Sequence, residues 1–194
     1  PLDQRDKYLK IIAEETKRLS RMVNRMLDAA KIQSGELILS PAPFDFTEMT
    51  AQILLSFEQK IEKKKLDVQC DLEERLTVMG DRDHLYRVVY NLTDNAVKFI
   101  EDGGTLRLKV HQEGQLCVFA ISISAEDLPH VFDRFYKTDR SRSMDKTGAG
   151  LGLYIVKNII NLHGGEISVR SGGGETEFEF TLPLAPEQNK PNNA

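Results

Sequence analysis

The chain has 194 residues, of which 40% are hydrophobic and 29% are charged, and its formal net charge at pH 7 is −4. This is an ordinary globular composition, and the negative charge, without any basic stripe, argues against a nucleic-acid binder. The longest apolar run, Leu116 to Ile121, is far shorter than the roughly 20 residues that a membrane-spanning helix needs. Cys70 and Cys117 stand alone, which favours two buried thiols in a reducing compartment over a disulfide or metal site.

The first predicted element is a helix from Asp3 to Gln33, ended by Gly35. Apolar residues recur along it in two series with a spacing of seven, interrupted only at Thr16: Ile12, Leu19 and Met26 in one, and Leu9, Val23 and Ala30 in the other. Such a heptad seam is typical of coiled coils. The pattern predicts a homodimer formed through this helix, and packing of the helix on its own domain is the alternative.

The middle and end of the chain alternate between helical and strand periodicity. Helices are predicted at residues 47–64, 81–99 and 154–163, and Lys63 to Lys65 are expected to be the solvated end of the first. Strands are predicted at residues 36–39, 66–72, 76–79, 106–110, 116–122, 166–171 and 177–182. This order indicates an α+β fold, a two-layer sandwich of one mixed, largely antiparallel sheet with three helices on one face, preceded by the coiled-coil-like helix. The expected domains are residues 1–34, 35–185 and a flexible polar tail at 186–194.

The helix that begins after Asp81 carries two stripes of side chains. The first is apolar and should face the core: Leu85, Val88, Leu92, Ala96 and Phe99. The second lies about 100° round the helix and is polar: His84, Arg87, Asn91, Asn95 and Lys98. Amide oxygens bind hard cations such as Mg²⁺, and an ammonium group can contact phosphate. The polar stripe therefore predicts one wall of a nucleotide site, with an ordinary solvated helix face as the alternative.

Three glycines at alternate positions, Gly148, Gly150 and Gly152, lead directly into the last predicted helix. Glycine lets the backbone approach a ligand closely, and a helix N-terminus offers unpaired N–H groups to an anion. The segment is not a Walker loop, because no Gly-Lys-Ser/Thr follows, and no clear strand precedes it as in a dinucleotide fingerprint. A plain glycine-rich turn before a helix remains the alternative.

Three segments, Asn91 to Phe99, Phe132 to Tyr136 and Gly148 to Leu153, together resemble the N, F and G2 boxes of the ATP-binding domain of sensor histidine kinases, members of the GHKL ATPases. The resemblance extends from about Asp3 to Leu184. It implies a Bergerat-type fold that binds ATP and Mg²⁺ between the Asn91 helix and the glycine-rich segment, under a lid at residues 137–147. The N-terminal helix would be the second helix of the kinase dimerisation domain. The family also implies a response regulator receiver domain as partner, and a cytoplasmic segment, itself without membrane contact, of a membrane-anchored sensor.

The resemblance also implies a role for individual residues. Asn95 and Asn91 would bind Mg²⁺, Lys98 would contact phosphate and Phe99 would pack near the nucleotide. The backbone amides of the glycine-rich segment would cradle the β- and γ-phosphates. The further expected nucleotide contacts are Ile123, Phe135, Lys137, Thr147, Gly148, Ala149, Gly150, Leu151, Gly152 and Thr176.

The reaction type follows from the first position of the N box. GHKL members that hydrolyse ATP resemble one another in having a glutamate there as general base, whereas this chain has Asn91, whose amide cannot take a proton from water at neutral pH. This favours a histidine kinase. The four histidines, His84, His111, His130 and His163, lack the sequence context of a phosphoacceptor. We therefore expect the phosphorylated histidine to lie on a helix outside this sequence.

One family motif is missing. Between Ser122 and Ile123 the resemblance calls for an Asp-x-Gly-x-Gly loop, the G1 box, whose aspartate binds the adenine amino group. If the protein lacks this loop, affinity for ATP should fall by about tenfold or more. A degenerate, non-catalytic dimerisation or nucleotide-binding module is then the alternative function. The other explanation is that the protein contains a loop at this point that the sequence does not include.

Overall fold

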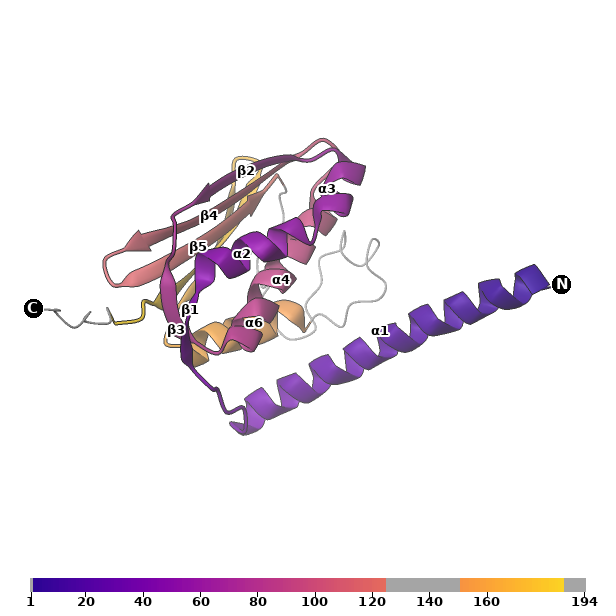
Figure 1. Cartoon of the computed structure of the whole chain (residues 1–194), viewed down its shortest axis with the longest axis horizontal. Helices are drawn as coiled ribbons and strands as arrows, with labels where there is room; N and C mark the ends of the chain where they lie inside the picture. Colours follow the sequence, from indigo (N-terminus) through magenta and orange to yellow (C-terminus); the bar gives the residue numbers. More distant parts are fainter. Residues whose placement is uncertain (1, 125–150, 187–194) are drawn as a thin grey trace, which may run out of the picture. The chain divides into compact units, whose positions relative to one another are not determined.

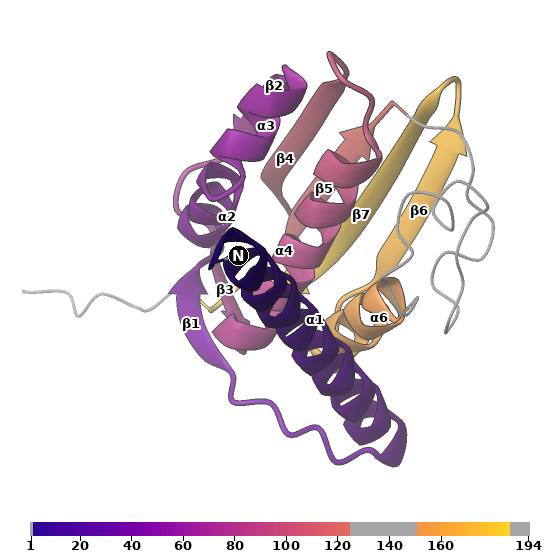
Figure 2. The ribbon, with the colours of Figure 1, turned by 90° about the vertical axis from the view of Figure 1, so that its right-hand side faces the viewer.

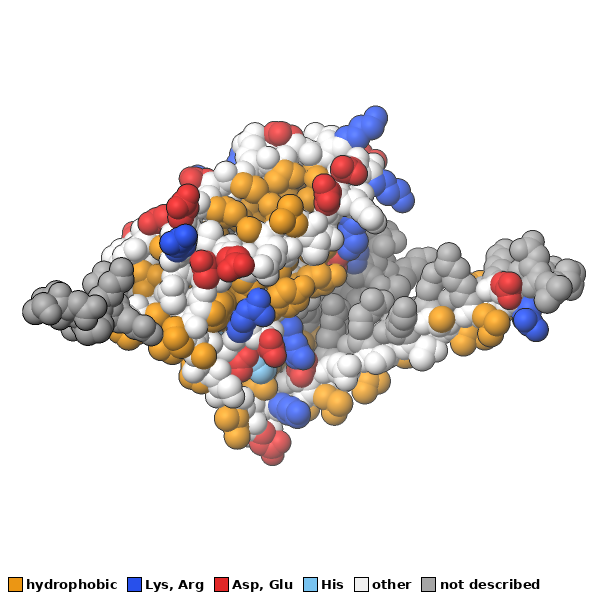
Figure 3. Space-filling model, viewed as in Figure 1, with side chains coloured by type: hydrophobic (Ala, Val, Ile, Leu, Met, Phe, Trp, Pro, Cys, Tyr) orange, Lys and Arg blue, Asp and Glu red, His pale blue; other side chains and the backbone are white. Residues whose placement is uncertain are grey.

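The computed structural model describes residues 2–124 and 151–186, and the chain divides into two compact units. The first unit contains α1 (Leu2–Ser34), a continuous helix of 33 residues that confirms the predicted N-terminal helix. Apolar side chains lie along its surface (Figure 3), and those of the predicted seam are exposed, from 42% for Met26 to 61% for Leu19. An exposed apolar seam is consistent with a helix that pairs with a second helix. The dimer itself stays a prediction.

The second unit is built on a five-stranded sheet in the order β2-β4-β5-β7-β6 (Figures 1 and 2). Only the pairing of β2 with β4 is parallel among these strands, which confirms the predicted mixed, largely antiparallel sheet. The strands are β2 (Asp67–Leu72), β4 (Thr105–Glu113), β5 (Leu116–Ile123), β6 (Ile167–Gly172) and β7 (Glu175–Pro183).

Two further strands form a small antiparallel sheet, β1 (Ala42–Asp45) with β3 (Thr77–Gly80). The prediction of a strand at residues 36–39 was wrong, because these residues have no strand partner and Ile38 is 85% exposed. The strand lies instead beyond Pro41 and includes Pro43. Proline is tolerated there because β1 pairs on one side only and needs no second row of N–H donors.

Among the described residues, four helices follow β1 in the chain: α2 (Phe46–Leu55), α3 (Glu58–Lys64), α4 (Arg82–Phe99) and α6 (Gly152–Leu162). The single helix predicted at residues 47–64 is therefore two helices. At the break, Ser56 donates its hydroxyl hydrogen to the Ile53 carbonyl oxygen, a local bond that competes with helix continuation. α6 begins at Gly152 instead of the predicted Tyr154.

The core lies between the sheet and the helices α2, α4 and the part of α6 from Val156 onward (Figure 2). At its centre Phe119 stacks on Phe180 with ring centroids 4.7 Å apart, and Phe46 meets both rings edge-on. This arrangement confirms the α+β two-layer sandwich. Cys117 is buried as predicted, but the prediction was wrong for Cys70, which is exposed because β2 is an edge strand.

Candidate functional site

α4 places the predicted amide pair beside its buried stripe, at half-buried positions. Asp81 caps the helix by accepting a hydrogen bond from the His84 N–H, 3.1 Å away, as predicted. The apolar stripe is buried except for Phe99, which is only half-buried. Asn91 and Asn95, one turn apart on this helix, are also half-buried, so part of each residue's surface is exposed.

Lys98 continues this polar stripe at the end of α4. Its Nζ lies 5.5 Å from the centroid of the Phe99 ring. The structure thus brings the predicted metal, phosphate and nucleotide contacts of the N box together on one helix. An ammonium group beside an aromatic ring and two amides can receive an anionic ligand that carries a planar base.

The donor set on α4 suits a metal ion that arrives with its ligand. Among the described residues, no group of three or more His, Cys, Asp or Glu side chains could hold a metal ion. Mg²⁺ commonly keeps several waters and is bound through one or two protein oxygens plus substrate phosphates. The amide oxygens of Asn91 and Asn95 match that need, so these residues fit Mg²⁺ bound as its nucleotide complex.

Two other predicted contacts, Ile123 and Thr176, are neighbours across the sheet. Ile123 ends β5 and pairs with Thr176 near the start of β7. Ile123 is 6% exposed and Thr176 is fully buried, and the Thr176 hydroxyl lies 3.1 Å from that of Ser171. Strand β5 keeps its register with β7 through the Ser122–Ile123 step, so the position expected for the G1 loop is the last step of this strand.

The glycine-rich segment is described only at its end. Leu151 is buried, and its carbonyl oxygen accepts the first hydrogen bond of α6, from the Ile155 N–H at 3.0 Å. Gly152 is the first residue of α6, and a side chain added there would meet nothing within 4 Å. The remaining predicted contacts lie outside the described residues, as do the F box and the lid: Phe135, Lys137, Thr147, Gly148, Ala149 and Gly150.

Sequence reasoning missed Lys64. We expected a solvated side chain, but its Nζ is partly buried and donates to the carbonyl oxygens of Lys98, at 3.0 Å, and Ile100, at 2.7 Å. These carbonyls belong to the last turn of α4, where the helix dipole favours a cation. A run of three lysines gives no signal of which one points inward.

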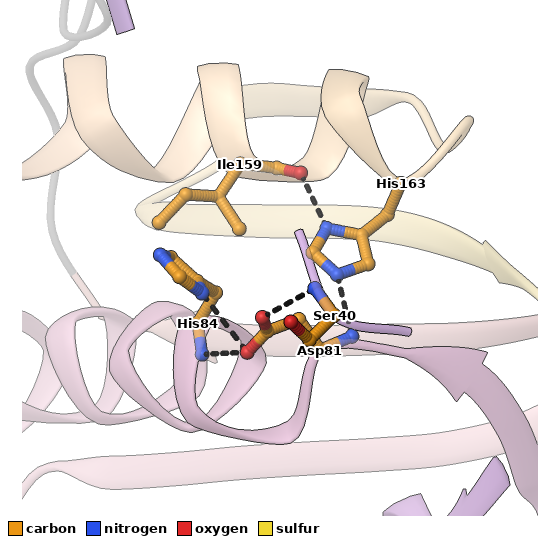
Figure 4. A network of polar contacts seen from close by, with 5 residues as sticks. All are labelled: Ser40, Asp81, His84, Ile159 and His163. Atoms are coloured by element: carbon orange, nitrogen blue, oxygen red, sulfur yellow. Dashed lines mark hydrogen bonds and ion pairs between the residues drawn. The ribbon is translucent and has the colours of Figure 1, made fainter. Parts of the chain in front are cut away.

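The sequence patterns also gave no sign of a polar network that joins the start of α4 to the end of α6 (Figure 4). The Asp81 backbone N–H donates to Nε2 of His163 at 2.9 Å, and Nδ1 of His163 lies 2.7 Å from the Ile159 carbonyl oxygen. The Asp81 carboxylate accepts from the Ser40 N–H at 3.0 Å as well as from the His84 N–H. Nδ1 of His84 is 2.9 Å from the same carboxylate, a close approach whose angles do not make a hydrogen bond.

The network shifts two pKa values. Burial alone would raise the pKa of Asp81, but the hydrogen bonds from the Ser40 N–H and from His84 outweigh it and lower the pKa to about 2. Burial lowers the pKa of His163, more than the Ile159 carbonyl and the Asp81 charge raise it. At neutral pH the site therefore holds an ionised Asp81 beside a neutral His163.

Within the described part of the chain, no helix has both the length and the apolar character needed to cross a membrane. Residues 80–186, which include all the predicted nucleotide contacts, match the family model described as histidine kinase-, DNA gyrase B- and HSP90-like ATPase.

Three individual proteins are also similar. The sensor histidine kinase YclK of Bacillus subtilis (strain 168) is 32% identical over 194 residues, which cover 97% of this chain and 41% of that protein. The sensor protein VanS of Enterococcus faecium is 31% identical over 191 residues, covering 96% of this chain and 50% of that protein. The crystal structure of the histidine kinase ThkA in complex with the response regulator protein TrrA matches with a TM-score of 0.73 and 27% identity, over 94% of this chain and 52% of that one. The chain thus spans half or less of the length of these two curated relatives.

Proposed function

Because the chain belongs to the histidine kinase-, DNA gyrase B- and HSP90-like ATPase family, with sensor histidine kinases among its relatives, we propose that it is the ATP-binding catalytic core of a two-component histidine kinase. In this role it binds Mg-ATP and transfers the γ-phosphate to a histidine on a dimerisation helix outside this sequence. The observation that carries the proposal is the half-buried pair Asn91 and Asn95, one turn apart on α4 and followed by Lys98.

Each residue of the site has a binding role in this proposal. Phosphoryl transfer depends mainly on positioning and charge neutralisation, which amides, ammonium groups and backbone N–H groups supply. Asn95 and Asn91 hold Mg²⁺, which neutralises phosphate charge when bound, and Lys98 contacts a phosphate. The other nucleotide contacts are Phe99, Ile123, Phe135, Lys137, Thr147, Gly148, Ala149, Gly150, Leu151, Gly152 and Thr176.

We propose a kinase rather than a hydrolase because α4 offers no free base beside the amides of Asn91 and Asn95. Asn91 occupies the position of the catalytic glutamate of the hydrolysing relatives, and an amide is no base at neutral pH. The neighbouring acid, Asp94, accepts a hydrogen bond from Lys60 Nζ at 2.8 Å. A carboxylate held in this ion pair is poorly placed to activate water.

We expect α1 to pair with the α1 of a second copy through its exposed heptad seam. The response regulator in the ThkA complex suggests a receiver domain as the partner that takes the phosphate onward. The chain would then be a cytoplasmic segment of a membrane-anchored sensor protein, with the membrane segments outside this sequence.

A second function is favoured by one observation, the missing Asp-x-Gly-x-Gly loop. Without the aspartate of this loop, the chain would be a dimerisation module that binds nucleotide weakly and does not transfer its phosphate. The intact mass of the purified protein separates the two explanations of this gap. A mass of 22.0 kDa makes the loop truly absent, whereas a heavier protein with extra peptides between Ser122 and Ile123 restores the G1 box.

Calorimetric titration with Mg-ATP tests the proposed site. We expect the Asn95→Ala variant to lose about tenfold or more in affinity, because a metal-coordinating oxygen is removed. Asn161→Ala is the matched control, since Asn161 is exposed at the far end of α6, and it should bind as the wild type does. Equal affinity of Asn95→Ala and wild type would remove Asn95 from the site.

A further inference from the structure

The contact between Asp81 and His163 joins the two helices on which the proposed nucleotide site depends. Asp81 immediately precedes α4, which carries Asn91 and Asn95, and His163 immediately follows α6, which begins at the glycine-rich segment. Both residues are buried, with 8% and 9% of their surface exposed. The N–H group of Asp81 has no partner inside α4, because the first N–H groups of a helix never do. It finds one in Nε2 of His163, 2.9 Å away.

The two bonds of the imidazole fix its protonation state. The Ile159 carbonyl can only accept, so the 2.7 Å contact requires a proton on Nδ1 of His163. The Asp81 N–H can only donate, so Nε2 must carry a lone pair. Only the neutral Nδ1–H tautomer satisfies both, and a protonated ring would lose the bond to Asp81.

The surrounding chain is shaped to accept this ring. A Cβ at Gly80 would lie 3.1 Å from Cδ2 of His163 and 2.5 Å from Cδ1 of Leu85. Any side chain at position 80 would therefore push against the ring. The Asp81 carboxylate is at the same time held by the N–H groups of Ser40 and His84. Asp81 is thus fixed from three directions, by the segment before β1, by α4 and by α6.

We infer that His163 is a positioning residue for the nucleotide site: by accepting the Asp81 N–H, it locks the end of α6 to the start of α4 and so holds the amide pair in register with the helix that begins at the glycine-rich segment. This inference rests on the proposed function. It assigns His163 no contact with the nucleotide. It predicts that loss of the bond to Asp81 weakens nucleotide binding even though the bond lies outside the proposed contacts.

Two amide variants separate this role from simple capping of α6. In His163→Gln the longer side chain places its oxygen where Nε2 was, so it can still accept from Asp81. In His163→Asn the shorter side chain reaches only the place of Nδ1, so it can bond the Ile159 carbonyl but not Asp81. The two variants share the same functional group and differ in which of the two bonds they keep.

We expect Mg-ATP affinity of His163→Gln to stay within about threefold of wild type and that of His163→Asn to fall by about tenfold, the effect of one buried hydrogen bond. The backbone amide NMR signals of Asn91 and Asn95 should shift in the Asn variant and stay near their wild-type positions in the Gln variant. Equal affinities and equal amide spectra for the two folded variants would overturn the inference, as would a Gln variant that is the more impaired.

A measurement on the wild type covers the case in which the Asn variant does not fold. Lowering the pH protonates His163 and breaks its bond to Asp81, so the amide signals of Asn91 and Asn95 should move together with the His163 ring signals. Asp81 and His84 face His163 from α4, and their own side-chain signals are followed in parallel. The inference would be overturned if the amide signals of Asn91 and Asn95 did not change over the pH range in which the His163 ring signals change. Because this readout needs no nucleotide, a wild type that fails to bind Mg-ATP would contradict the proposed function alone.

Discussion

The ammonium group of Lys64 donates a hydrogen bond of 2.7 Å to the carbonyl oxygen of Ile100, and so joins the end of α3 to the end of α4. Its second bond, to the Lys98 carbonyl, holds the backbone of a proposed phosphate contact. Carbonyls at a helix C-terminus lack intrahelical donors, and the helix dipole makes a cation favourable there. Lys64 is therefore a structural support of the last turn of the N box.

We predict that Lys64→Met lowers the free energy of unfolding by about 1–2 kcal/mol, since methionine keeps the apolar stem and loses the charged donor. Lys63→Met is the matched control, because Lys63 is an exposed neighbour on the same helix. It should change stability by less than about 0.5 kcal/mol. Urea unfolding of both variants measures the difference, and equal effects would show that the two carbonyl contacts add nothing.

Lys65 ends α3 in the left-handed region, at φ 52° and ψ 42°. Glycine adopts this conformation without the steric cost of a Cβ, so Lys65→Gly should raise the free energy of unfolding by about 1 kcal/mol. The same change two residues earlier, inside the helix at Lys63, should lower it by about 1 kcal/mol. Opposite signs in urea unfolding check the prediction, and a loss of stability in both variants would contradict it.

Gly165 has no room for a side chain, because a Cβ there would lie 1.9 Å from the carbonyl oxygen of Thr181 on β7. The obstacle is backbone, which cannot turn aside as a side chain can. Gly165→Ala should therefore destabilise the protein by about 3 kcal/mol. Gly172→Ala should be within about 0.5 kcal/mol of wild type, since nothing lies within 4 Å of the added carbon. Thermal unfolding that ranks the two variants equally would contradict this account of Gly165.

The pH dependence of stability should show two separate acid windows. Burial lowers the pKa of His163 in the folded protein below the ordinary value of 6.5. Its contribution is therefore complete above that value and is lost as the pH falls below it, with a slope of at most about 1.4 kcal/mol per pH unit. The Asp81 pKa of about 2 lies below its ordinary 3.8, so its contribution disappears only as the pH falls from 3.8 toward 2.

Urea unfolding at pH 8, 6 and 5 measures the first of these windows. His163→Gln should flatten the loss of stability between pH 6.5 and 5, because glutamine does not titrate, and should leave the lower window unchanged. A wild-type slope that persists in the Gln variant would assign the loss of stability to a group other than His163.

Periodicity was enough to predict the elements whose burial follows from local sequence. Strand β4 alternates buried and more exposed residues over its first half, β5 is a continuous apolar run that is buried from Cys117 to Ile123, and α4 has an apolar stripe with Asp81 as its cap. The helix break at Ser56 was not predictable, because Ile53 and Phe57 are both buried and continue the same helical pattern. Strand β1 was misplaced because the short apolar run at residues 36–39 has the composition of a strand. The true position of β1 depends on its pairing with β3, a tertiary contact that the local sequence does not show.

The supports of the site were missed for a similar reason. The bond between Asp81 and His163 joins residues 82 positions apart, and that between Lys64 and Ile100 joins residues 36 positions apart. No local pattern carries such pairings. Sequence motifs predicted the residues expected to touch the ligand, whereas the contacts that hold these residues in place became visible only in the folded chain.

The most direct test of the proposed function is transfer of radiolabelled γ-phosphate from Mg-ATP to a supplied dimerisation domain that carries the histidine. We predict label on that domain that is lost in acid and stable in base, as expected for phosphohistidine, and no label with the Asn95→Ala variant. A folded dimer that binds Mg-ATP but transfers no phosphate would contradict the kinase and favour the non-catalytic module.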